Sequence, residues 1–141
     1  MNPQTEWNNR WKFFYHFTGL GMNIYNTFKH GMEVPIYSGL LEHLVTKEGF
    51  PVERNKSLPI YWGDDLTTAT CTIDFLIKGK IIVETYSQEE ITQTERQHLK
   101  NLLTLTHCPY GMIMNYSRLN FYFEWYYRDP QSGIIDKIKL L

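Results

Sequence analysis

The sequence predicts a single α/β domain, spanning residues 1–141, built on a mixed β-sheet. A chain of 141 residues buries roughly two-thirds of its unfolded surface, which is enough for a core without disulfides. Hydrophobic residues make up 43% and charged residues 21%, close to ordinary globular usage. The hydrophobic period changes along the chain in the order helix, helix, strand, strand, strand, helix, strand and hairpin, which is typical of helices packed on a mixed sheet.

Two helices are predicted in the first third of the chain. Over residues 7–30, apolar or small residues recur at steps of three and four: Trp7, Trp11, Phe14, Phe17, Gly21, Ile24 and Phe28. Gly19 and Gly21 each weaken such a helix by about 1 kcal/mol, which predicts a bend or break there. The second helix covers residues 35–48, with Pro35 in its first turn and Gly49 as its stop.

Three strands follow, at residues 58–62, 67–77 and 80–86. The middle strand alternates strictly, which assigns one face to its apolar residues: Ala69, Cys71, Ile73, Phe75 and Ile77. Asp74 lies on the other face, with three threonines. A tight turn at Lys78-Gly79 joins this strand to the next.

A third helix is predicted over residues 88–106, a buried strand over 112–116, and a terminal hairpin from strands 120–127 and 134–140. Between Tyr116 and Tyr127, seven of twelve residues are aromatic. They could form a platform on which bases stack. Alternatively, one face is core and the other a dimer or edge contact, which the scarcity of nearby positive charge favours.

The charge balance limits the partners. Lys plus Arg is 14 and Asp plus Glu is 15, so nucleic acid would have to bind a local patch rather than a basic surface. The partners we expect are therefore nucleic acid at such a patch, or a second copy through the C-terminal hairpin. Two distant cysteines and the absence of a secretion signal or an apolar span predict a cytoplasmic protein that does not enter a membrane.

Asp74 and Glu84 are the strongest candidates for chemistry. A two-residue loop at Lys78-Gly79 would send the two carboxylates to opposite faces. A three-residue loop that includes Lys80 pairs residue 77 with residue 81 and places Asp74 opposite Glu84, and the apolar pattern favours this register. Two facing carboxylates repel unless a cation lies between them, so the pair predicts a divalent metal site. The alternative is an ordinary solvated acidic face.

From Tyr37 onward the sequence resembles the GxxExxY proteins, a small bacterial branch of the PD-(D/E)XK nuclease superfamily. The resemblance covers roughly residues 10–117 and is carried by short motifs in register: Ile36-Tyr37, residues 52–54, 58–61, 73–77 and 80–84, Glu95-Arg-Gln97 and residues 111–115. It implies a restriction-endonuclease-like fold, a mixed central sheet flanked by helices. It also implies Mg²⁺ or Mn²⁺ held by Asp74, Glu84 and the carbonyl of Thr85, with Gln97 as a supporting group.

The sequence departs from this pattern at three positions. Tyr86 stands where the family has the lysine of Glu-x-Lys, and a tyrosine carries no positive charge to stabilise the transition state. The family's helix glutamate falls on Val34, although Glu33 at one position earlier could share a helix face with Tyr37. Thr72 replaces a basic residue. Lys78, Lys80 or Lys100 could supply the missing charge, and Lys100, one turn after Gln97, is the best placed.

Two functions follow from this pattern. The preferred one is a nuclease-superfamily domain in which metal-dependent phosphodiester hydrolysis is weakened or lost and the scaffold serves as a binding or assembly module. The alternative is an active Mg²⁺- or Mn²⁺-dependent nuclease that uses Asp74 and Glu84 with a relocated lysine. Loss of one transition-state group costs roughly 10²–10³ in rate, so the two differ measurably.

Overall fold

The computed structural model describes residues 3–139, with side chains from residue 11 onward. The elements in chain order are α1 (Pro3–Phe28), α2 (Val34–Lys47), β1 (Val52–Trp62), β2 (Asp65–Ile77), β3 (Ile81–Tyr86), α3 (Gln93–Thr106), β4 (Tyr110–Tyr116), β5 (Phe121–Arg128) and β6 (Ile135–Lys137). Within the described residues, no helix is long and apolar enough to cross a membrane.

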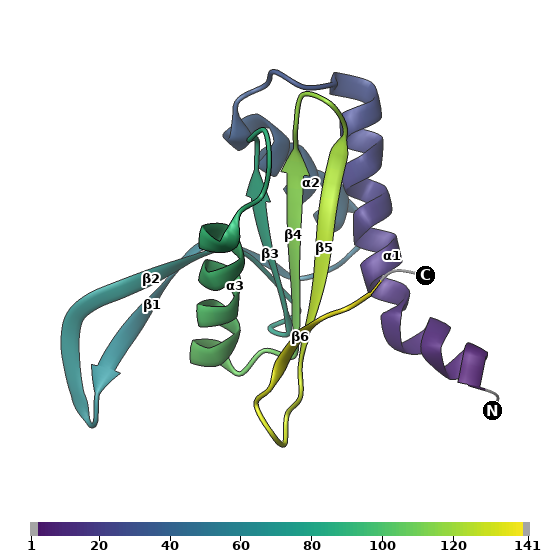
Figure 1. The fold of residues 1–141 in the computed structure, drawn as a ribbon. Coiled ribbons are helices and arrows are strands. Elements are labelled where there is room, and N and C mark those ends of the chain that lie inside the picture. Colours follow the sequence, from purple (N-terminus) through teal and green to yellow (C-terminus); the bar gives the residue numbers. More distant parts are fainter. Residues whose placement is uncertain (1–2, 140–141) are drawn as a thin grey trace.

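The six strands form one sheet whose spatial order is the order of the chain, β1 to β6. Every neighbouring pair is antiparallel except β3 and β4, which are parallel and are joined by α3. In Figure 1, α1 and α2 cover one face of the sheet and α3 covers the other. The predicted mixed sheet with flanking helices is therefore confirmed.

The core on the α1/α2 side is built mainly from aromatic side chains. The predicted stripe of α1 supplies Trp11, Phe14, Phe17 and Ile24, all buried; the side chain of Trp7 lies outside the described part of the chain. Of the predicted bend or break, the break does not occur, because α1 is helical without interruption through both glycines. Gly21 lies so close to β5 that an added Cβ would come 2.6 Å from Phe121 Cζ, so close packing rather than flexibility explains this glycine.

The predicted helix boundaries hold for α2 but not for α3. Pro35 is in the first turn of α2 as expected. The third helix begins at Gln93 rather than at residue 88, because the Thr92 side chain accepts a hydrogen bond from the Thr94 N–H and caps the helix there. Its buried face packs on the opposite side of the sheet, around Leu99, Leu102 and Leu103.

The first two strands are longer than predicted and extend away from the body as a two-stranded arm (residues 57–72; Figure 1). At the base of the arm, Leu58 and Cys71 pack against the α3-side core, whereas its tip is exposed. β1 begins at Val52 instead of residue 58. The expectation of one shared apolar face along β2 fails at Ile73: Phe75 and Ile77 join the α1/α2-side core, but Ile73 joins the α3-side core. The change of side coincides with the point where β2 stops pairing with β3, just before Phe75.

The C-terminal hairpin consists of β5 and a short β6, which ends at Lys137 rather than at residue 140; Leu140 lies outside the described residues. Alternate aromatic side chains of β5 pack into the two cores, and the indole N–H of Trp125 donates to Thr18 Oγ1 at 2.9 Å. Ile134, the residue just before β6, is 61% exposed. Association of two copies through this hairpin stays a prediction.

Candidate functional site

The register of β2 and β3 brings the two acidic residues together. Ile77 pairs with Ile81 and Phe75 with Val83, as a three-residue connection requires. Lys78 and Gly79 have φ of 57° and 68°, left-handed values that close this turn. Beyond Phe75 the ladder between these strands ends, and the side chains of Asp74 and Glu84 form the next hydrogen bonds between the strands.

The Asp74 carboxylate is held from three directions. Its Oδ2 accepts from the Thr85 N–H at 3.1 Å and from the Thr85 hydroxyl. Its Oδ1 lies 3.4 Å from Nη2 of Arg54, whose Nε also donates to the Asp74 carbonyl at 3.1 Å. The Arg54 guanidinium lies over the Phe75 ring, 4.2 Å from its centre, and also contacts Glu42 at 3.3 Å. The protein itself thus gives Asp74 hydrogen-bond donors and one cationic partner, a guanidinium that Asp74 shares with Glu42.

Glu84 has a different environment. Its side chain is buried, and its Oε1 accepts from the Asp74 N–H at 3.1 Å. Burial raises the pKa of Glu84, the hydrogen bond from Asp74 lowers it, and the negative charge of Asp74 raises it further, with a net pKa of about 8. Nε2 of His98, on α3, is 3.9 Å from Glu84 Oε2. Burial in this position therefore disfavours the charged form of Glu84.

Both carboxylates line one open pocket of about 340 Å³ at the base of the arm. Its other walls come from the start of α2 and from β1, β2 and β3: Val34, Pro35, Ser38, Arg54, Asn55, Thr72 and Thr85. The Ser38 hydroxyl lies 2.7 Å from that of Thr85, which fixes α2 against the strand. A ligand in this pocket would meet one guanidinium, two carboxyl groups and several hydroxyls.

The other predicted site residues lie outside this pocket. Tyr86 is half-buried against the α3-side core, where burial and the nearby Glu84, Glu95 and Asp74 charges raise its pKa. Glu33 is exposed at the N-cap of α2, where its side chain caps nothing. Gln97 is exposed and donates to Asn101 at 2.9 Å. Lys100 is half-buried on α3.

Tyr37, the proposed partner of Glu33, has a structural role. Its ring is fully buried and stacks on Tyr116, with ring centres 4.1 Å apart, and its hydroxyl donates to the Lys29 carbonyl. Glu33 and Tyr37 therefore contribute no shared polar surface to the pocket.

The sequence analysis did not identify Arg54 and His98 as residues of the site. Arg54 pairs with Phe75 across the β1–β2 ladder, which places it beside Asp74. That neighbourhood could be inferred only by extending the predicted strand back from residue 58, over a stretch where charged and polar residues dominate. His98 is one residue after the predicted Gln97, on the side of α3 that faces Glu84.

The oxygen atoms of Asp74, Glu84 and Thr85 are of the type that binds a divalent cation, but their arrangement does not leave them free to do so. Carboxylate and carbonyl oxygens are the ligands that Mg²⁺ and Mn²⁺ prefer. However, Asp74 Oδ1 is engaged by Arg54 and Oδ2 by Thr85. In the described residues, no three His, Cys, Asp or Glu side chains gather in a metal-binding group. A cation would have to displace the Arg54 guanidinium from Asp74.

A mixed sheet with two acidic residues on a central hairpin and helices on both faces defines the restriction-endonuclease-like class. A family model described as the PD-(D/E)XK nuclease superfamily matches residues 12–125, so the chain belongs to this superfamily. A solved structure titled "Crystal structure of SSO0001" is similar, with a TM-score of 0.52 and 16% sequence identity, and supports the fold. The match covers 64% of this chain and 48% of that one, so this chain spans about half its length. No curated protein matches the chain significantly.

Proposed function

We propose that this chain is a PD-(D/E)XK superfamily domain of the GxxExxY type in which metal-dependent phosphodiester hydrolysis is weakened or lost. The scaffold then serves as a binding or assembly module. The observation that carries the proposal is the contact of Arg54 with Asp74, which supplies from within the chain the positive charge that a metal would supply.

The lysine position supports the same function. Tyr86 follows Glu84 by two residues, but its ring packs among apolar side chains of the α3-side core and its raised pKa keeps the hydroxyl neutral. A neutral hydroxyl cannot offset the charge that builds on a phosphate during hydrolysis. Of the described side chains, the cationic ones that contact the two acidic residues are Arg54 and, when protonated, His98.

An active Mg²⁺- or Mn²⁺-dependent nuclease is the second candidate function. It is favoured by the placement of Asp74 and Glu84 on one open pocket at the surface. In such an enzyme these carboxylates and the Thr85 carbonyl would hold the cation, which would supply Lewis-acid activation of water. Lys100 or His98, both on α3, would have to replace the lysine.

A cleavage assay distinguishes the two functions. The wild type and the variants Asp74→Asn and Lys100→Ala are incubated with single- and double-stranded DNA and RNA, in millimolar Mg²⁺ or Mn²⁺ and in chelator. We expect at most trace cleavage above the chelator control in any sample. Multiple-turnover cleavage by the wild type that needs metal and is lost in Asp74→Asn would overturn the proposal in favour of the active enzyme, and its loss in Lys100→Ala would identify the relocated lysine.

A further inference from the structure

The tip of the arm exposes large apolar side chains. Trp62 is 81% exposed, Leu66 is 65% exposed and Tyr61 is 58% exposed. Tyr61 pairs with Leu66 and Trp62 with Asp65 across the ladder, so neighbouring side chains point to opposite faces of the ribbon. The tip is therefore apolar on both faces, and neither face is covered by the body of the protein (Figure 1).

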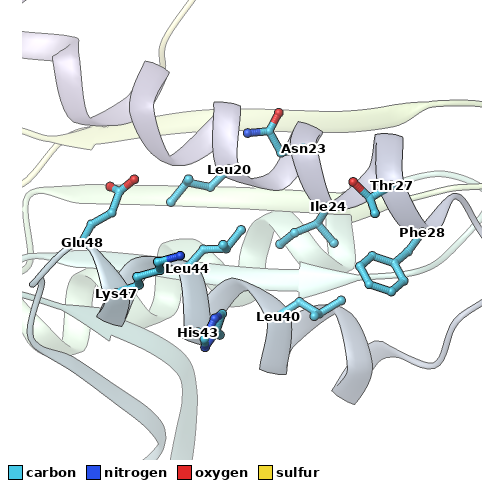
Figure 2. Close-up of a pocket in the computed structure, with 10 residues that line it drawn as sticks. All are labelled: Leu20, Asn23, Ile24, Thr27, Phe28, Leu40, His43, Leu44, Lys47 and Glu48. Carbon is cyan, nitrogen blue, oxygen red and sulfur yellow. The ribbon is translucent and has the colours of Figure 1, made fainter.

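An apolar groove lies elsewhere on the molecule, between α1 and α2. Figure 2 shows Leu20, Ile24 and Phe28 of α1 on one side and Leu40 and Leu44 of α2 on the other. Leu20 and Ile24 are buried, so the apolar surface open to a partner comes from Phe28, which is 39% exposed, and from the half-buried Leu40 and Leu44. The groove has a volume of about 550 Å³, within the range of roughly 300–1,000 Å³ that binding pockets occupy. A tip with two apolar faces suits a groove with two apolar walls, because each face can contact one wall.

The charges of the two surfaces are complementary. The turn at the arm tip carries Asp64 and Asp65, both exposed. The rim of the groove carries Lys47 and His43, and the one rim acid, Glu48, is hydrogen-bonded to His16. Lys47 forms no ion pair with the described residues, so its charge is available to an acidic partner.

The same acidic turn argues against nucleic acid at the arm tip. Two aspartates beside Trp62 would repel phosphates, whereas affinity for nucleic acid depends on neutralising them. Figure 1 places the tip on the opposite side of the body from α1, so the tip does not reach the groove of its own chain. These observations favour a second copy of the chain as the source of the tip.

We propose that this protein self-associates by inserting the arm tip of one copy, with Trp62, into the α1–α2 groove of another. Asp64 and Asp65 of the inserted tip lie against Lys47 and His43 of the receiving copy. Exchanged reciprocally, the two contacts form a twofold dimer, in which the same surfaces serve on both subunits. This interface is separate from the C-terminal hairpin and does not depend on whether the carboxylate pocket is catalytic.

Sedimentation velocity on the full chain tests the proposal. We expect the wild type to sediment at micromolar concentration as a species of about twice 16.8 kDa. Trp62→Ser should weaken the dimer at least tenfold, as loss of a buried aromatic anchor does. Leu119→Ser is the matched control, because Leu119 is 84% exposed on a different loop and its substitution should leave the dimer unchanged. Both sites are exposed, so neither variant should unfold.

A charge exchange tests which surfaces meet. Lys47→Glu places like charges at both contacts of its homodimer, and so does Asp65→Lys, so each variant alone should be monomeric. Mixed in equal amounts, the two variants restore opposite charges at both contacts and should form a heterodimer. A monomeric wild type, a dimer that survives Trp62→Ser, or a mixture that stays monomeric would each overturn the proposal.

Discussion

Two buried glutamates lie beside α3 on the same sheet, and their environments are opposite. Glu124 of β5 is 1% exposed and Glu84 of β3 is 6% exposed. Burial acts to raise the pKa of Glu124, but hydrogen bonds from Arg96, Tyr122 and Tyr126 outweigh it and hold the pKa at about 2. At Glu84 burial prevails and the pKa is about 8.

The number of donors explains the difference. Arg96 donates two hydrogen bonds to the Glu124 carboxylate, through Nε at 3.0 Å and Nη2 at 2.8 Å. The Tyr126 hydroxyl donates to the same carboxylate at 2.5 Å, and Lys137 Nζ lies 3.5 Å from it. Glu84 accepts a hydrogen bond from one backbone N–H. A fully paired buried carboxylate contributes to structure, whereas a poorly paired one lining a pocket is typical of a functional site. The carboxylate of Glu124 is thus fully paired, whereas the carboxyl group of Glu84 is buried with too few partners to stabilise its charge.

The largest expected effect breaks the well-paired site. Arg96→Ala leaves Glu124 buried without its bidentate partner, and we expect the free energy of unfolding to fall by about 3–5 kcal/mol. Urea unfolding at neutral pH measures this loss. Arg118→Ala, at an exposed loop residue, should change the stability by less than about 0.5 kcal/mol. A loss below about 1 kcal/mol in Arg96→Ala would show that the Glu124 network is not a structural anchor.

The second prediction concerns a variant that removes the ionisable group of Glu84. Because the folded pKa of Glu84 is raised, its ionisation disfavours the folded state as pH rises from 4.5 to about 8. Glu84→Gln should therefore increase the free energy of unfolding by about 2–4 kcal/mol at pH 8 and leave it nearly unchanged at pH 4. Unfolding curves at the two pH values measure the difference. Equal stability of variant and wild type at pH 8 would contradict the poor pairing of Glu84.

The smallest effect is expected at His98. Its side chain is 39% exposed and lies 3.9 Å from Glu84 Oε2, beyond hydrogen-bond range. His98→Ala should change the free energy of unfolding by less than about 0.5 kcal/mol. A loss above about 1.5 kcal/mol, measured by the same urea unfolding, would contradict this prediction. It would show that His98 stabilises buried Glu84 as Arg96 stabilises buried Glu124.

The sequence predicted the acidic pair because the evidence for it is local. Apolar alternation and a short turn determine the register, and the register places Asp74 beside Glu84. It did not predict the partners that decide the chemistry. Arg54 is twenty positions from Asp74, and Arg96 is twenty-eight from Glu124, so both contacts depend on the sheet and on helix placement.

Helix α1 shows the same limit. Its apolar period was readable, but the role of Gly21 required knowing that Phe121 packs against it. Local propensity predicts a weak point at that glycine, whereas tertiary packing keeps the helix continuous. The sequence likewise predicts too late a start for β1, because residues 52–57 lack the apolar alternation of a half-buried strand.

Calorimetric titration of Mn²⁺ tests the central claim, that Arg54 takes the place of a metal at Asp74. Wild type, Arg54→Gln and the double variant Arg54→Gln/Asp74→Ala are compared at neutral pH. We expect no binding below millimolar Mn²⁺ in the wild type, measurable binding in Arg54→Gln, and none in the double variant. Micromolar binding by the wild type that Asp74→Ala abolishes would contradict the claim, because the carboxylates would then hold a cation with Arg54 still present.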